Sequence, residues 1–171
     1  MVRLFGRQKR SRDSGGFDEK TRMMGQLTVR LFDERGRLKH EQTVRNSVTQ
    51  FQRDHTFYLI ASQVPAQAGG CWFAVGTSNT AAATTDTALY GEVGSRIAGT
   101  FSHQAGLATY GMLATFPANN PATAYTLYEA GIFATSTSNT ATAYYRATYA
   151  AVTKATSDSL QLIWTITETI S

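Results

Sequence analysis

The sequence is poor in cysteine, in charged residues and in long apolar runs, and each shortage excludes a class of protein. Its one cysteine, Cys71, excludes a disulfide framework and a cysteine zinc site. No stretch approaches the roughly 18 consecutive apolar residues that a membrane helix needs. The opening residues, MVRLFGRQKR, lack the apolar centre of a secretory signal. We therefore expect a soluble protein that is made in the cytoplasm and has no membrane partner.

Charged residues make up 16% of the 171 residues, well below the roughly 25% of an ordinary globular domain. Thr, Ser, Ala, Tyr and Gly take their place, as in the stretch TSNTAAATTDTAL. This composition favours β structure with small polar turns over Lys/Glu-rich helices. The length fits one domain with an appendage.

The positive charge is concentrated near the start of the chain. Residues 1–53 hold 13 Lys/Arg and six Asp/Glu, whereas residues 54–171 hold three Lys/Arg and six Asp/Glu. The densest basic stretch has little to bury and ends near Gly15-Gly16, so we interpret residues 1–25 as an arm and residues 26–171 as the folded domain. The residues of the arm that we expect to contact a partner are Arg3, Phe5, Arg7, Lys9, Arg10 and Arg12.

Three interpretations of the arm stay open. Clustered Arg and Lys beside phosphates gain from counterion release, which would suit nucleic acid. The arm could equally be a solvated tail. We favour a third interpretation, in which it clasps a neighbouring protein and becomes ordered on assembly, because Val2, Leu4, Phe5 and Phe17 offer apolar anchors among the charges.

The spacing of apolar residues predicts mainly β structure. From Asn46 onward apolar residues recur at helical spacing, which predicts one helix over residues 47–62. Elsewhere alternation and turn residues predict about seven strands, with a long Thr/Ser/Ala loop over residues 76–89. We expect an antiparallel β-sandwich with the helix against an edge or end, although a small barrel would also fit. The predicted strands are 26–32, 37–44, 71–75, 107–116, 126–134, 142–153 and 160–169.

Motifs of catalysis and metal binding are missing from the sequence. It contains no phosphate-binding glycine loop, no HExxH and no GxSxG. The three histidines, His40, His55 and His103, lie far apart, and Cys71 sits in an apolar run that suits a small buried side chain better than a nucleophile. We expect no enzyme activity, no metal and no cofactor.

Four charged residues lie among aromatic and apolar residues in the β region. A buried charge is costly unless it is paired, so we expect Arg96 and Arg146 to form structural ion pairs with Glu92 and Glu129. A pair of catalytic carboxylates, or contact with a ligand or subunit, are the alternatives.

Six of the eight tyrosines follow residue 100 and could form a surface that stacks against sugars. Tyrosine also suits a sandwich core or a subunit interface, because it combines a large apolar ring with a polar tip. We favour the core or interface, and keep a carbohydrate-binding module as an alternative function.

The order of several short motifs resembles that of small virion proteins of tailed bacteriophages. The resemblance covers about residues 26–170, and the motifs are weak singly but more specific in this order. They are Arg45-Asn46-Ser47-Val48-Thr49, Phe73-Ala74-Val75-Gly76-Thr77, Asp86-Thr87-Ala88-Leu89, Glu92-Val93, Arg96, Glu129-Ala130-Gly131-Ile132-Phe133, Arg146-Ala147-Thr148-Tyr149, Thr153-Lys154 and Leu162-Ile163-Trp164-Thr165-Ile166-Thr167.

This resemblance implies a non-enzymatic structural component of the virion. Such proteins decorate capsids, form head fibres or associate with tails, so we expect first a capsid decoration (cement) protein that binds the major capsid protein or other virion proteins. A collar, adaptor or fibre-base protein of the neck or tail is the alternative. The arm is longer than the pattern leads one to expect. A homo-oligomer would fit either role, and contact with nucleic acid is possible but not favoured.

Overall fold

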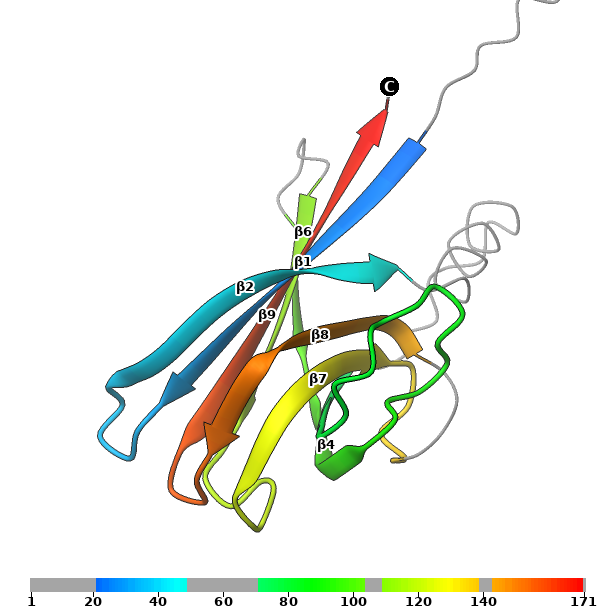
Figure 1. Ribbon diagram of the computed structural model, residues 1–171. Coiled ribbons are helices and arrows are strands. Elements are labelled where there is room, and N and C mark those ends of the chain that lie inside the picture. The colour runs from blue at the N-terminus through cyan, green and yellow to red at the C-terminus, as the bar shows by residue number, and fades with distance from the viewer. Residues whose placement is uncertain (1–20, 49–70, 104–108, 139–142, 171) are drawn as a thin grey trace, which may run out of the picture.

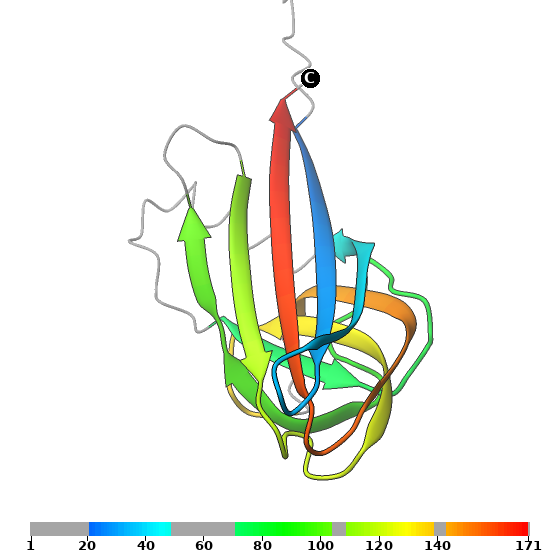
Figure 2. The ribbon, with the colours of Figure 1, turned by 90° about the vertical axis from the view of Figure 1, so that its left-hand side faces the viewer.

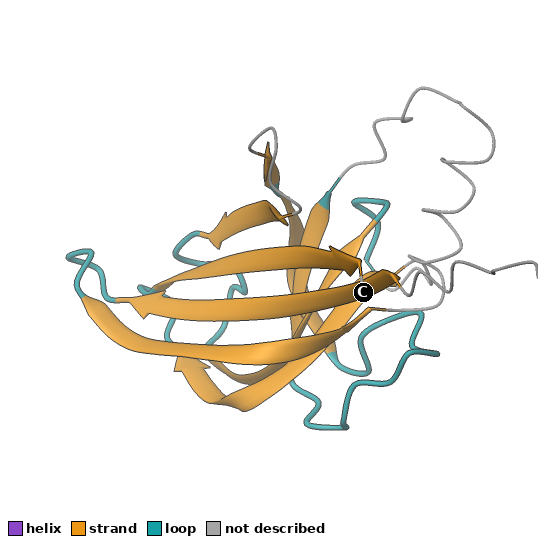
Figure 3. Ribbon diagram, turned by 90° about the horizontal axis from the view of Figure 1, so that it is seen from above, coloured by secondary structure: helices purple, strands orange, loops and turns teal. Residues whose placement is uncertain are grey.

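The computed structural model describes residues 21–48, 71–103, 109–138 and 143–170, and these residues form strands and loops without a helix (Figure 3). The strands are β1 Thr21–Phe32, β2 Leu38–Val48, β3 Trp72–Gly76, β4 Glu92–Ala98, β5 Thr100–His103, β6 Thr109–Phe116, β7 Tyr125–Phe133, β8 Ala143–Lys154 and β9 Ser159–Ile170.

The strands build two antiparallel sheets of five and four strands, which pack as a β-sandwich. Sheet A has the order β2-β1-β9-β6-β5, and sheet B has the order β8-β7-β3-β4. Figure 1 shows the sheets as two layers, with the first residues of β1 and the last residues of β9 projecting beyond sheet B. These projecting ends pair with each other from Thr21, opposite Ile170.

The two sheets are joined along both sides of the sandwich. On one side β2 leaves β1 and pairs with β8, where Ser47 lies opposite Arg146. On the other side the chain passes from β4 directly into β5 through Gly99, whose N–H donates to the carbonyl of Cys71 at 2.6 Å. A Cβ at Gly99 would collide with the ring of Phe73, so this sharp corner requires glycine.

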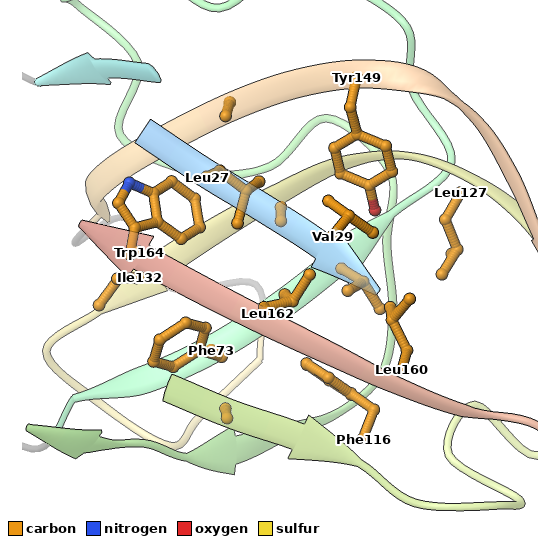
Figure 4. Close-up of a cluster of buried hydrophobic side chains, with 14 of the residues drawn as sticks. Leu27, Val29, Phe73, Phe116, Leu127, Ile132, Tyr149, Leu160, Leu162 and Trp164 are labelled. Atoms are coloured by element: carbon orange, nitrogen blue, oxygen red, sulfur yellow. The ribbon is translucent and has the colours of Figure 1, made fainter. Parts of the chain in front are cut away.

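The core lies between the sheets and is built by the alternation that predicted the strands (Figure 4). The largest buried ring, Trp164, meets Phe73 edge-on at 6.1 Å between ring centroids. Its neighbours along β9, Leu162 and Ile166, are also fully buried, whereas Ile163 and Thr165 face outward and are half-buried. Burial of this apolar stripe is the main favourable contribution to folding.

The hairpin between β1 and β2 shows why a short polar sequence makes this turn. The Asp33 carboxylate accepts hydrogen bonds from the backbone N–H groups of Arg35 and Arg37, each at 2.9 Å. Gly36 takes a positive φ of 74°, which glycine adopts without steric cost.

The antiparallel β-sandwich expected from the sequence is confirmed, and the described residues form nine strands in place of about seven. The two strands that the sequence did not predict are β4 and β5, because Gly94 and Gly99 interrupt the alternation there. The predicted helix over residues 47–62 is wrong at its start, since Ser47 and Val48 end β2, and residues 49–62 lie outside the described residues.

The boundary of the arm also moves. β1 starts at Thr21, so residues 21–25, which we assigned to the arm, pair with β9 as the first part of a strand. The six predicted contact residues of the arm, Arg3 to Arg12, lie outside the described residues.

We expect Leu162→Ala to lower the free energy of unfolding by about 2–5 kcal/mol, because the lost methyl groups leave a cavity in the core. The neighbouring Gln161 faces outward, so Gln161→Ala should cost less than about 1 kcal/mol. Urea unfolding of both variants measures the difference. Equal costs would contradict the register of β9.

Candidate functional site

The buried charges of sheet B lie on its outer side, where Arg146 of β8 stands beside Glu129 of β7. Both side chains are fully buried. The Nε of Arg146 donates to Oε2 of Glu129 at 2.9 Å, and Nη2 lies 2.8 Å from the same oxygen. Two neighbouring strands therefore carry a paired cation and anion under a covering segment.

That covering segment is the loop of residues 77–91, which supplies the other partners of Arg146. Nη1 of Arg146 donates to Oδ2 of Asp86 at 2.7 Å and to the carbonyl of Ala81 at 3.3 Å. Nη2 donates to the carbonyl of Thr80 at 2.8 Å. With the two contacts to Glu129, every N–H of the guanidinium has an acceptor. The ring of Tyr90 lies 4.7 Å from the guanidinium carbon and completes the site with a cation–π contact.

The two carboxylates of this network are also saturated. Glu129 accepts the backbone N–H of Gly91 at 2.8 Å and that of Tyr90 at 3.3 Å. Asp86 accepts the N–H of Ala83 at 2.7 Å and the hydroxyl of Tyr90 at 3.2 Å. The network therefore ties the loop to sheet B at its middle and at its end, in one charge-assisted cluster.

Glycine and small apolar residues make room for the loop. A Cβ at Gly76, which pairs with Glu129 in the β3–β7 ladder, would occupy the position of the Glu129 carboxylate. Leu89 of the loop packs into a small apolar cluster with Ala74, Phe133 and Ala143. Loop 77–91 is therefore packed against the outer side of sheet B and covers part of it.

The second predicted ion pair lies on β4. Arg96 binds Glu92 with two parallel hydrogen bonds, at 2.8 Å and 2.9 Å, and its Nη1 donates to the carbonyl of Thr135. Residues four apart in a regular strand stand about 13 Å apart. A break in the strand at Gly94, with a φ of 72°, brings the two side chains together. The guanidinium also stacks on Phe133, 3.7 Å from its ring centroid.

A third charged group closes the opposite end of the sandwich. Lys39 of β2 donates to both carboxylate oxygens of Asp158, at 3.0 Å and 2.8 Å. Partial burial opposes ionisation of Asp158, but the hydrogen bonds from Lys39 and the N–H of Ala155, with the charges of Lys39 and Lys154, lower its pKa overall. Burial lowers the pKa of Lys154, and the nearby Asp158 opposes this shift.

The structure therefore brings the four predicted ion-pair residues together as two pairs, Arg96 with Glu92 and Arg146 with Glu129. The sequence interpretation missed the role of Asp86, which enters the network from a loop far away in sequence. Asp86 is the single charged residue among residues 77–91, and this position gives no sign of which residue it binds.

The remaining candidates have ordinary structural environments. Cys71 is half-buried beside the core, and burial raises the pKa of its thiol to about 11, so it stays protonated at neutral pH. Tyr145 and Tyr149 are buried in the core, and burial raises the pKa of both hydroxyls. In the described part of the chain no three His, Cys, Asp or Glu residues gather as a metal site would require, and no helix is long and apolar enough to span a membrane.

Comparison with known proteins gives no relative of this chain: no protein-family model, no curated protein and no solved structure matches it. What the chain does must therefore be argued from its own residues.

Removing the Arg146 side chain should lower the stability of the protein, because it leaves the buried carboxylates of Asp86 and Glu129 without their cation. We expect Arg146→Ala to lower the free energy of unfolding by about 3–5 kcal/mol. The matched control is Arg30→Ala, which breaks an exposed pair with Glu41 and should cost under about 1 kcal/mol. Chemical denaturation compares the two, and similar small costs would show that the buried network does not hold the loop.

The lowered pKa of Asp158 predicts a dependence of stability on pH. A carboxyl group whose pKa is lower in the folded than in the unfolded protein stabilises the fold at every pH above its ordinary pKa of 3.8. This stabilisation is lost as the pH falls through the pKa of the folded state. The stability advantage of the wild type over Asp158→Asn should therefore be largest near neutral pH and should shrink below about pH 4. Thermal unfolding across pH measures the advantage, and one that grows on acidification would contradict the assignment.

Proposed function

We propose that this chain is a non-enzymatic structural component of a tailed-phage virion, and that it decorates the capsid by binding the surface of neighbouring subunits. The observation that carries the proposal is the buried network around Arg146, which holds loop 77–91 as a fixed layer on sheet B. A loop held in this way binds without the entropy cost of ordering it first.

The surface of the loop has the chemistry of a contact surface. Its one charged residue, Asp86, is buried in the network, so its exposed residues carry no charge. Hydroxyl groups can form direct hydrogen bonds to a partner, and the methyl groups of Thr and Ala add apolar contact area without a charge to desolvate. The exposed residues of the loop are Thr77, Asn79, Thr80, Ala81, Ala83, Thr84, Thr85, Thr87 and Tyr90.

The use of the buried charges supports a scaffold as well. Arg96 and Arg146 each donate to a carboxylate and to a backbone carbonyl, and stack on an aromatic ring. All five N–H groups of Arg146 are used in this way, so Arg146 positions the backbone and has no donor left for a substrate. The motif order that resembles tailed-phage virion proteins supplies the virion part of the proposal.

The arm adds a second point of attachment. The first twenty residues precede the projecting end of β1 and contain Arg3, Arg7, Lys9, Arg10 and Arg12. Twenty residues can span up to about 65 Å, which would cross a neighbouring subunit. Once the β-domain is bound, the arm acts at a high effective concentration, so two modest contacts give tight attachment.

The proposal is tested by immunogold labelling of purified virions with an antibody to residues 21–171. We expect gold scattered over the head, because decoration proteins are present in many copies. Gold confined to the neck or tail would replace decoration with the collar, adaptor or fibre-base role. Absence of the protein from the particles by mass spectrometry would refute the virion assignment.

Deletion of residues 1–20 separates the contributions of the arm and of the domain. Because β1 begins at Thr21, the shortened chain should keep the melting temperature of the full chain, yet lose most of its binding to virions that lack the protein. The double change Thr84→Lys and Thr85→Lys alters the exposed loop and should weaken binding independently. Undiminished binding of the shortened chain would contradict the role of the arm.

A further inference from the structure

The outer face of sheet A is uncharged on β9, β6 and β5, where it carries Thr, Ser, Gln, Ile and Leu side chains. Since Leu27, Leu162 and their equivalents face the core, the alternate residues point outward. One row of paired residues crosses all five strands of the sheet. From β2 to β5 that row is Thr43, Thr28, Ile163, Leu113 and Thr100.

Six hydroxyl groups of this face are hydrogen-bonded within the sheet, those of Thr28, Thr43, Thr100, Ser102, Thr109 and Thr167. Thr28 and Thr43 share a hydrogen bond of 2.9 Å between their hydroxyls, and the Thr109 and Thr167 hydroxyls lie 3.3 Å apart. Thr100 donates to the carbonyl of Leu113 at 3.3 Å. When such a face is buried, few polar groups lose a hydrogen-bond partner, and the apolar side chains of Ile163 and Leu113 are removed from water. The free-energy cost of desolvating the face is therefore small.

The two sheets of the sandwich differ in what covers them. Sheet B carries loop 77–91, with Leu89 buried on its outer side. The hydrogen bonds of the side chains on the outer face of sheet A stay within that sheet, in the part of the chain that the structure describes. Figure 2 looks onto this side, where β6, β9 and β1 lie side by side in front of sheet B. At one end of the face Met24 is 55% exposed.

We infer that the outer face of sheet A binds the same face of a second copy of this chain, about a two-fold axis near the middle strand, β9. The distribution of charge favours this occupant. The charged side chains of this face lie on its first two strands, β1 and β2, where Arg30 pairs with Glu41 and Arg45 is exposed. The opposite margin, on β5, carries Thr100 and Ser102.

A two-fold axis near β9 lays the charged margin of each copy over the hydroxyl margin of the other. No like charges then meet, and Ile163 and Leu113 come together in the centre. The same twist and strand spacing on both sides allow the aligned packing that two β-sheets adopt. A strongly charged partner would find no matching charges in the centre of the face.

The size of the face matches a reversible dimer. Four strands of about seven residues and the four residues of β5, at about 4.8 Å between strands and about 3.3 Å per residue, give about 500 Å² in projection on each copy. The total of about 1,000 Å² is at the lower end of specific interfaces. The inference does not rest on the virion role, because the association is measured on isolated protein.

Sedimentation velocity of the full chain over about 5–500 μM tests the inference. We expect the wild type to shift from monomer to dimer within this range. Ile163→Lys and Thr43→Lys place a charge in the interface without a partner and should weaken dimerisation at least about 100-fold and 10-fold respectively, Thr43 being nearer the rim. Thr43 is exposed, so its variant should fold even if Ile163→Lys does not.

The matched control is Ala151→Lys, an equal charge at an exposed position of β8, which should leave the dimer unchanged. A wild type that stays monomeric at every concentration would overturn the inference. So would a dimer that survives in folded Ile163→Lys and Thr43→Lys, which would point to pairing through the free edge of β5 instead. Equal loss of the dimer in Ala151→Lys would also overturn it.

Discussion

The arrangement of sheet B depends on one guanidinium. Arg146 is fully buried, and it is tolerated there because Glu129, Asp86 and two backbone carbonyls accept all of its N–H groups. A buried ion network adds little net stability over an apolar cluster, but it accepts one geometry only. In this protein that geometry brings two strands and the middle of a fifteen-residue loop (77–91) to the same point. Because Arg146 holds the inner side of this loop, the uncharged side chains on its outer side are kept in a fixed arrangement at the protein surface.

Where the backbone ladders stop, amide side chains continue them. β2 and β8 share two residue pairs at one end, and farther along the Gln42 amide bonds both the N–H and the C=O of Ala150. The Asn120 amide bonds both backbone groups of Ser95 in the interrupted part of β4. Each amide offers a donor and an acceptor, as a neighbouring strand would. The strands can therefore separate at these places while their backbone N–H and C=O groups stay hydrogen-bonded. Backbone groups that are already bonded are not available for pairing with a strand of another chain.

The fold and part of the site could be predicted from the sequence because their signals are local. Alternation marks β1 and β9, and the positions of Arg146 and Glu129 among aromatic residues indicate that each needs a partner of opposite charge, without saying which one. The part that could not be predicted depends on contacts between distant residues. Asp86 joins Arg146 across sixty residues through a loop without regular pattern, and Glu92 reaches Arg96 only because the strand is interrupted at Gly94. Local spacing carries no information about either contact.

The two proposals assign a different kind of contact to each sheet of the domain. Sheet B is covered by its own loop, whose fixed irregular shape suits a partner that is complementary to that shape. Among the described residues no loop covers the outer face of sheet A, which is regular and nearly uncharged at its centre, and a regular face fits best against an identical one. In a dimer that stacks sheet A on sheet A, the two copies of loop 77–91 lie on opposite outer sides, because the loop covers the outer side of sheet B. Such a dimer would present its loops in opposite directions and would link two partner proteins, rather than bind one surface twice.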